Sequence, residues 1–134
     1  EIVCAVARQL LTATSKSVER SQLSVRDVNR VYEARDILAE QFRKPPSIPE
    51  LARAVGVNQT KLKAAFKSLF DLTINDFTTK CRMERASELL ISSSLCISEI
   101  AYAVGYDHPA NFSIAYKRYA GYSPREARRG TRKR

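Results

Sequence analysis

The side chains best placed to do chemistry in this sequence are three lysines within QTKLKAAFKSLF, residues 59–70. The apolar residues of this segment recur at spacings of three and four, which predicts an amphipathic helix with an inward face of Leu62, Phe66, Leu69 and Phe70. Lys61, Lys63 and Lys67 then point elsewhere and give the helix a basic outer face. Such a face suits a polyanionic partner.

The other reactive side chains form no recognisable catalytic or metal-binding set. Cys4, Cys81 and Cys96 are too far apart for a zinc knuckle or a redox pair, so we expect reduced thiols in a cytoplasmic protein. His108 is the single histidine, and neither paired carboxylates, a Ser/His/Asp set nor a glycine-rich phosphate loop is present. We therefore expect no enzymatic activity, no metal and no cofactor.

Charge favours nucleic acid as the partner. The chain has 23 Lys and Arg against 14 Asp and Glu, a net charge of +9. Residues 96–134 hold eight of the positive charges and only three negative ones. An ordinary basic surface is the alternative. The sequence contains no signal peptide. It also contains no apolar run that approaches the roughly 18 residues needed to cross a bilayer, so we expect no membrane partner.

Patterning predicts an all-α chain. Residues 2–11 predict a short extra N-terminal helix, followed by a polar linker up to Ser24. Ser24 and Asp27 resemble an N-cap arrangement, and the apolar stripe after them predicts a helix of roughly 18 residues that stops at Pro45–Pro46.

Cap signals predict three further helices before residue 95. Ser47 with Glu50 resembles a capping box for a short helix that ends at Gly56, and Asn58 can cap the helix over residues 59–70. Thr73 with Asp76 predicts a longer helix that fades at residues 92–94.

The pattern then repeats. Ile97, Ile100, Ala101, Val104 and Gly105 reproduce residues 48–56 at an offset of 49, and positions from Phe112 to Pro124 reproduce residues 62–74 at an offset of 50. The second copy thus has one extra turn residue. Matches at this many apolar, glycine and cap positions indicate an internal repeat.

Each copy predicts a helix, a glycine-bearing turn and a second helix. One such pattern is equally compatible with a plain helical hairpin used for packing and with a helix that enters a DNA major groove. The presence of two copies favours DNA binding over a packing role. A helix over residues 74–92 would span roughly 28 Å at about 1.5 Å per residue, comparable with the roughly 34 Å between successive major grooves.

The segments ELARAVGVNQTKLKAAFK, RMERASELL and ISEIAYAVGYDHPANFSIAYKRYAGYSP resemble the DNA-binding domain of the AraC/XylS transcription regulators. The resemblance implies two helix-turn-helix subdomains joined by a long linker helix. We expect three parts. Residues 1–24 are the end of an upstream domain or a linker with a short helix, residues 25–92 are the first helix-turn-helix subdomain with the linker helix, and residues 93–134 are the second subdomain with the basic tail. A small-molecule effector would act only through an N-terminal sensing domain that is missing here. The stretch EARDILAEQFRKPPSIPELARAVGVNQTKLKAAF is also similar to regulators of siderophore biosynthesis and uptake.

The resemblance also implies DNA contacts. In the first recognition helix, base contacts fall to Gln59, Thr60, Lys63 and Ala64, and phosphate contacts to Lys61 and Lys67. Lys63 is the best base-reading candidate, because lysine can donate to O6 and N7 of guanine; the alternative is a lysine that is merely solvated or bound to phosphate. The second helix offers Ala110, Asn111 and Ile114 to bases, and phosphate contacts fall to Ser113, Lys117, Arg118 and Arg125.

The second recognition helix departs from the family, because its base-facing positions lack a long hydrogen-bonding side chain. Ala110 and Ile114 could contact thymine methyl groups while Asn111 bonds to adenine, or this unit could mainly hold the DNA backbone; we favour the backbone role. Asp107 is expected to be its N-cap, with Pro109 in the first turn. Other departures are Asp71, where a left-handed residue is needed, and Cys96, where Ser or Thr would cap more firmly.

The leading hypothesis is a transcription regulator, an activator, that binds double-stranded promoter DNA and contacts RNA polymerase. One alternative is the DNA-targeting part of a repair methyltransferase, which would need a zinc-held cysteine cluster upstream that the three cysteines do not supply. The other is a non-specific architectural binder, in which the basic tail dominates and salt dependence is strong.

Overall fold

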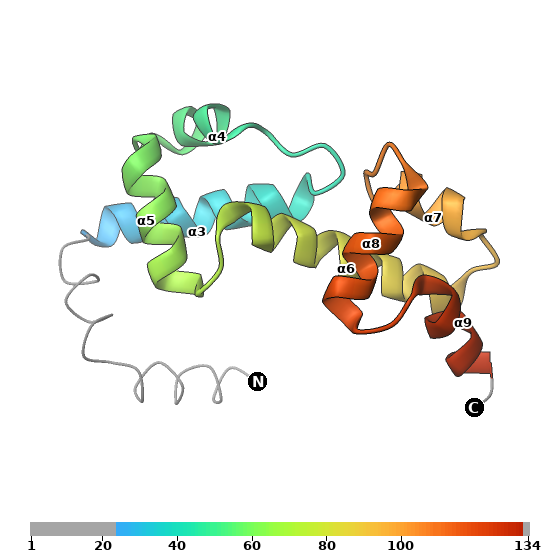
Figure 1. Ribbon diagram of the computed structural model, residues 1–134. Helices are drawn as coiled ribbons and strands as arrows, with labels where there is room; N and C mark the ends of the chain where they lie inside the picture. Colours follow the sequence, from blue (N-terminus) through green and yellow to red (C-terminus); the bar gives the residue numbers. More distant parts are fainter. Residues whose placement is uncertain (1–23, 133–134) are drawn as a thin grey trace, which may run out of the picture. The chain divides into compact units, whose positions relative to one another are not determined.

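The computed structural model describes residues 24–132, and this part of the chain consists of helices joined by turns and loops, without a strand (Figure 1). The expected all-α class with two helix-turn-helix pairs is confirmed. The predicted N-terminal helix over residues 2–11, and Cys4 within it, lie outside the described residues. The helices are α3 (Val25–Glu40), α4 (Ile48–Val55), α5 (Gln59–Phe70), α6 (Ile74–Ser92), α7 (Ile97–Ala103), α8 (Pro109–Ala120) and α9 (Pro124–Arg132).

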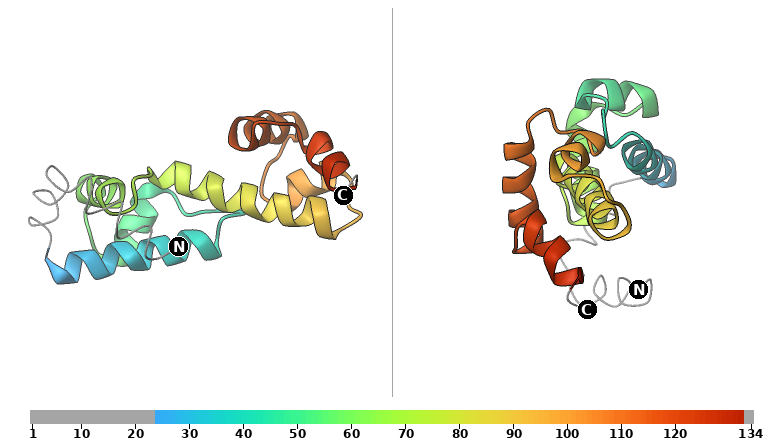
Figure 2. Two further views of the ribbon diagram at one scale, coloured as in Figure 1. Left: turned by 90° about the horizontal axis from the view of Figure 1, so that it is seen from below. Right: turned by 90° about the vertical axis from the view of Figure 1, so that its right-hand side faces the viewer.

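The described residues fall into two compact units. Unit 1 contains residues 24–37 and 47–74, and unit 2 contains residues 38–46 and 75–132. The long helix α6, unbroken in Figure 2, gives Met83, Ala86 and Leu90 to the core of unit 2. The structure therefore groups residues 75–92 with the second helix-turn-helix, whereas the division expected from the sequence places them with the first.

The buried residues of both units lie at helical spacing. In unit 1 most of them come from α3, α4 and α5, and these include Val31, Ala34, Leu51, Ala52, Val55, Leu62, Ala65 and Phe66. In unit 2 the core cluster comes from α6, α7 and α8, and its residues are Met83, Ala86, Leu90, Ile100, Ala101, Val104, Phe112 and Tyr116. Leu38, near the end of α3, is also buried and belongs to unit 2. These apolar stripes hold each pair of helices together by hydrophobic burial.

The internal repeat is confirmed by the helix boundaries. Helices α5 and α8 both have 12 residues, and they start at Gln59 and Pro109, 50 positions apart. Their partners α4 and α7 have eight and seven residues. In each unit a short helix, a turn and a longer helix follow one another in the same order (Figure 1).

The cap residues of unit 1 fix where its helices begin and end, as predicted. The Asp27 amide donates to Ser24 Oγ at 3.1 Å, the Glu50 amide to Ser47 Oγ at 3.3 Å, and the Lys61 amide to Asn58 Oδ1 at 2.8 Å. Gly56 ends α4 in the left-handed conformation, with φ of 74°. These bonds satisfy amides that a helix start otherwise leaves without a partner.

Two predicted boundaries were wrong. Helix α3 ends at Glu40, before Pro45, because the chain turns at Gln41–Lys44 and the Phe42 carbonyl accepts from Arg82 Nε at 2.9 Å instead of continuing the helix. The N-cap of α8 is His108, not Asp107. Pro109 occupies the first helical position, where the missing amide hydrogen costs nothing, and the His108 side chain makes no capping bond.

Asp71 and Cys96 depart from the residues expected at their cap positions, but both positions keep the backbone geometry of a helix cap. Asp71 adopts the left-handed conformation, with φ of 62°, and its amide donates to the Lys67 carbonyl, as a helix end requires. Asp tolerates this conformation better than most residues. At the start of α7, Glu99 Oε1 accepts from the Cys96 amide at 3.3 Å, so one of the two bonds of a capping box is supplied from the third residue of the helix.

Candidate nucleic-acid interface

Helix α5 presents one exposed polar face. The predicted contact residues of this helix are all exposed, and they are Gln59, Thr60, Lys61, Lys63, Ala64 and Lys67. Leu62, Ala65 and Phe66 are buried on the opposite side. Residues 60, 63, 64 and 67 follow the spacing of three and four that places side chains along one helix face. The structure thus brings the predicted set together on a surface open to a partner.

The three lysines of this helix have different surroundings. Lys61 Nζ forms an ion pair with Asp27 Oδ2 of α3 at 2.6 Å, and Lys67 Nζ donates to the Asp71 carbonyl at 3.2 Å. The Lys63 side chain makes no ion pair or hydrogen bond with any residue in 24–132. Lys63 can therefore bind an external acceptor without giving up an internal one.

The ion pair of Lys61 is not predictable from the sequence. The hydrogen bond from the Lys61 ammonium is the main cause that lowers the pKa of the Asp27 carboxyl group below its ordinary value, with a further bond from Ser24. Lys61 is thus held against α3, and a phosphate contact by this residue would compete with Asp27.

A single arginine of α3 holds the turn that precedes α5. Arg30 Nη1 donates to the Val55 carbonyl at 2.7 Å and to the Gly56 carbonyl at 3.2 Å. These carbonyls at the end of α4 have no partner within the helix, and a cation there also complements the helix dipole. A side chain at position 56 would fall on the Arg30 guanidinium, so Gly56 provides the space as well as the conformation.

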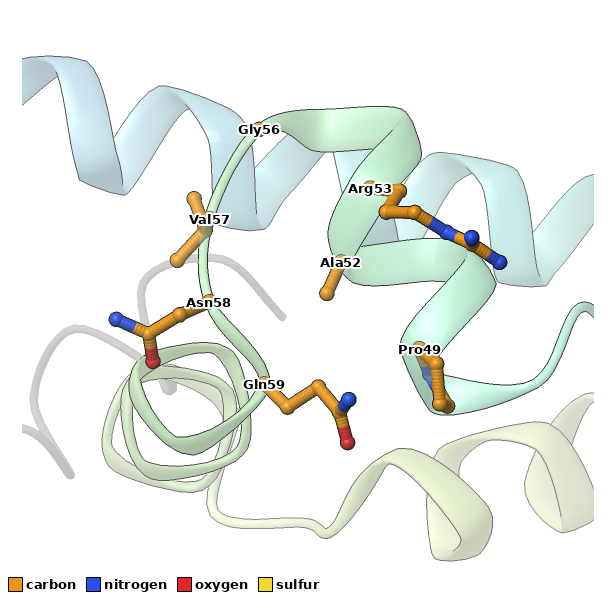
Figure 3. Close-up of a pocket in the computed structure, with 7 residues that line it drawn as sticks. All are labelled: Pro49, Ala52, Arg53, Gly56, Val57, Asn58 and Gln59. Carbon is orange, nitrogen blue, oxygen red and sulfur yellow. The ribbon is translucent and has the colours of Figure 1, made fainter.

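An open hollow of about 600 Å³ lies between α4 and the start of α5 (Figure 3). It is lined by Pro49, Ala52, Arg53, Gly56, Val57, Asn58 and Gln59. In Figure 3 the Gln59 side chain extends from the start of α5 toward the side on which Pro49 lies, and the Arg53 side chain projects from α4. The hollow leaves Gln59 accessible from outside and holds no group of acids or histidines.

Helix α8 presents a different surface. Ala110, Asn111, Ile114, Lys117 and Arg118 are exposed, and Ser113 is half-buried. Ile114 retains 60% of its accessible surface. Phe112 and Tyr116 are buried on the inner side. Most of the predicted residues therefore lie outward, but the first half of this helix has no cation, and Ala110 and Ile114 lie there beside the polar Asn111.

In unit 2 the turn between α7 and α8 is stabilised by other contacts. Gly105 has φ of 103°, and a side chain there would meet the backbone of Arg43, whose carbonyl carbon lies 3.0 Å from the Cβ position. Arg82 donates to the Phe42 carbonyl and lies over the Tyr106 ring, 5.1 Å from its centroid. The segment after α3 is thus packed directly on the turn between α7 and α8.

The arginines of α9 differ in role. Arg128 donates from Nε to the Leu90 carbonyl at 3.2 Å and from Nη2 to the Ser93 carbonyl at 3.3 Å. It therefore caps the end of α6 and stabilises the fold. Arg125 is exposed beside a small hollow of about 180 Å³ that it lines with Ile97, Arg128 and Arg129. Arg125 can therefore reach an external anion.

Residues 24–132 contain no group of three or more His, Cys, Asp or Glu side chains arranged to hold a metal ion. Within the same residues, every helix is too short or too polar to cross a membrane.

Comparison with known proteins identifies the family. A model of the helix-turn-helix domain family matches residues 51–130. The C-terminal domain of AraT, a response regulator from Geobacillus stearothermophilus, is 35% identical with a TM-score of 0.71, and the match covers 75% of this chain and 84% of that one. A Chromobacterium violaceum regulator of the AraC-type DNA-binding class is 27% identical with a TM-score of 0.72, over 77% and 92% of the two chains. The chain belongs to the AraC type of helix-turn-helix DNA-binding domains.

The curated relatives of this AraC-type domain are longer proteins. The regulatory protein PchR of Pseudomonas aeruginosa is 35% identical over 88 residues, which are 66% of this chain and 30% of PchR. Across the first three relatives the chain spans between 30% and 46% of their length. Sequence-specific DNA binding is the activity of such a domain, and the resemblance to AraC/XylS regulators is confirmed.

Proposed function

We propose that this chain is the part of a transcription regulator that recognises promoter DNA by placing α5 and α8 in two adjacent major grooves. The observation that carries the proposal is the repeat itself. Two helices of equal length occupy the same place in two copies of one motif, and each turns an exposed face of predicted contact residues outward. The net charge of +9 favours association with the phosphate backbone.

In unit 1, Lys63 is proposed to read a guanine, helped by Gln59, Thr60 and Ala64, while Lys67 binds phosphate. The exposure of these residues and the freedom of the Lys63 ammonium support this division. Lys61 would contact phosphate only by exchanging its ion pair with Asp27. In unit 2, phosphate contacts are proposed for Ser113, Lys117, Arg118 and Arg125.

The footprint of the chain on a selected duplex tests the proposal. Duplexes are first selected from a random pool, and hydroxyl-radical cleavage then maps protection on both strands. Two protected regions about one helical turn apart, roughly 34 Å, are expected. Protection of a single groove would refute the two-groove hypothesis. Equal affinity for selected and unselected duplexes would instead support a non-specific architectural binder.

Two lysine variants test the division of labour in α5. Lys63→Ala is expected to weaken binding to the selected duplex by about 1–3 kcal/mol and to relax the preference at one base pair. Lys67→Ala is expected to weaken selected and random duplexes alike. Titrations with both duplexes at fixed salt measure the effects. Equal losses on both duplexes for both variants would refute the role of Lys63 in base reading.

The wider role of the protein belongs to the same proposal. We infer an activator, without catalytic activity, that contacts RNA polymerase at a promoter in the cytoplasm and takes a small-molecule effector, of siderophore type, through a sensing domain outside this chain. The resemblance to AraC/XylS regulators supports this inference. A reporter gene downstream of the selected site tests it: transcription should rise when the full-length protein is supplied, and repression would contradict an activator.

A further inference from the structure

The outward surface of the first half of α8 is less polar than that of α5, and it carries no cation. At the offset of 50, Thr60 is matched by Ala110, Lys63 by Ser113 and Ala64 by Ile114. Gln59 is matched by Pro109. The first half of α8 therefore carries no side chain long enough to donate to guanine, and its most prominent outward side chain is an isoleucine.

Packing within unit 2 does not account for Ile114. The side chain is 60% exposed, and it belongs neither to the buried core nor to the partly buried residues packed on that core. Tyr119, the other exposed large apolar residue of α8, has by contrast a ring neighbour in Tyr116, with centroids 6.4 Å apart. The core of unit 2 therefore leaves the Ile114 side chain available to a partner.

The neighbours of Ile114 indicate which partner. Ala110 lies four residues before it, and Lys117 and Arg118 lie three and four residues after it, so all four share one side of the helix. The apolar pair is followed by two exposed cations. This order fits a helix whose first half enters a major groove while its second half meets phosphates, whereas an apolar protein partner would have to desolvate both charges.

We propose that α8 recognises the 5-methyl group of thymine, with Ile114 and Ala110 packed against such methyl groups in the major groove. We call the stretch of DNA that unit 2 binds the second half-site, and the stretch that unit 1 binds the first half-site. The inference rests on the proposed DNA-binding function. The thymine methyl is the apolar group that bases present in this groove, and apolar side chains are its usual contacts. Exposed Asn111 can add a bidentate bond to an adenine.

This specificity differs from a backbone anchor, the role that the sequence alone favours. An anchor would use Lys117, Arg118 and Arg125 and would leave Ile114 without a role. Methyl recognition instead makes the second half-site sensitive to a single carbon atom in the DNA, because deoxyuridine pairs like thymidine but lacks the methyl group.

Deoxyuridine substitution in the selected duplex is the test. Each thymidine is replaced in turn, and the Kd of the full 134-residue chain is measured for each duplex. At one or two thymidines of the second half-site, a loss of about fourfold is expected, as for the burial of one methyl-sized group at roughly 0.8 kcal/mol. In the Ile114→Ala variant the loss should become much smaller at the thymidine that Ile114 contacts, while a thymidine that Ala110 contacts should keep its response.

Two controls separate methyl contact from other effects. Ile114→Ala should leave untouched any effect of deoxyuridine in the first half-site, and Ile114→Val, which keeps a branched apolar surface, should retain most of the sensitivity. Far-UV circular dichroism confirms the fold of each variant. Since Ile114 is exposed, no loss of stability is expected.

The outcomes distinguish this inference from the function beneath it. Specific binding with no response to deoxyuridine in the second half-site would leave the DNA-binding proposal intact and overturn methyl recognition. Methyl recognition is overturned in the same way if Ile114→Ala weakens thymidine and deoxyuridine duplexes equally. Failure to select any preferred duplex would refute the proposed function and this inference together.

Discussion

The bond between Arg30 and the end of α4 makes a stability prediction that can be worked out in detail. Arg30→Ala removes a donor 2.7 Å from the partly buried Val55 carbonyl and a second, longer bond to the exposed Gly56 carbonyl. A hydrogen bond from a charged group is worth about 1.5–3 kcal/mol, and the exposed bond adds little because water replaces it. We expect the free energy of unfolding of unit 1 to fall by about 2 kcal/mol.

Gly56→Ala perturbs the same contact from the other side. A left-handed alanine is strained by about 1–2 kcal/mol, and its Cβ would also displace the Arg30 guanidinium and break both bonds. The total loss in the native background is therefore about 3–4 kcal/mol. In the Arg30→Ala background only the backbone strain remains, so the same substitution should then destabilise by about 1–2 kcal/mol.

Urea denaturation followed by circular dichroism at 222 nm measures these differences, and hydrogen exchange of the α5 amides localises them to unit 1. Arg26→Ala is the matched control, because Arg26 is an exposed arginine one turn earlier on the same helix, and it should change stability by less than about 0.5 kcal/mol. Additive effects of Arg30→Ala and Gly56→Ala, with no coupling of about 2 kcal/mol, would refute the reasoning.

Three further predictions follow from single contacts. Ser68 has a buried hydroxyl group that finds no hydrogen-bond partner among residues 24–132, so Ser68→Ala should raise the free energy of unfolding by about 1 kcal/mol, seen as a higher urea midpoint. The pKa of Asp27 is lowered in the fold, mainly by Lys61, so its contribution to stability is present above pH ~4 and is lost as pH falls through the folded pKa. Asp27→Asn should therefore flatten the pH dependence of the urea midpoint below pH ~4, and an unchanged slope would contradict the ion pair. Gly105→Ala should destabilise unit 2 by more than about 2 kcal/mol, since both its φ and the Arg43 backbone oppose a side chain, and the footprint should lose the second half-site before the first.

Local signals in the sequence were sufficient for much of the fold. Ser47, Gly56 and Asn58 define helix ends through bonds to residues at most four positions away, so residue type and spacing predict them. The repeat was equally accessible, because buried positions in two copies of one motif require the same apolar residues. These are the features in which local preference and tertiary packing agree.

Features that depend on distant partners could not be predicted. Arg30 and Val55 are 25 residues apart, and nothing near Arg30 distinguishes it from Arg26, so its role at the end of α4 emerges only from packing. The pairing of Lys61 with Asp27 is of the same kind. The choice of His108 over Asp107 as the cap is subtler, because the longer turn of the second copy shifts the helix start by one residue, where Pro109 fixes it.

In each unit, the residues that maintain the fold lie inside, and the residues proposed to read the DNA sequence lie on the outer surface. Phe66 and Tyr116 occupy equivalent buried positions and are both aromatic, because each must fill the space between its own helices. Lys63 and Ile114 lie outward on the same two helices, where nothing inside the protein restricts their chemistry. A repeat with a common interior can thus present a hydrogen-bonding surface in one copy and an apolar surface in the other. The half-sites of the operator should then differ in base composition even though the units that bind them are alike.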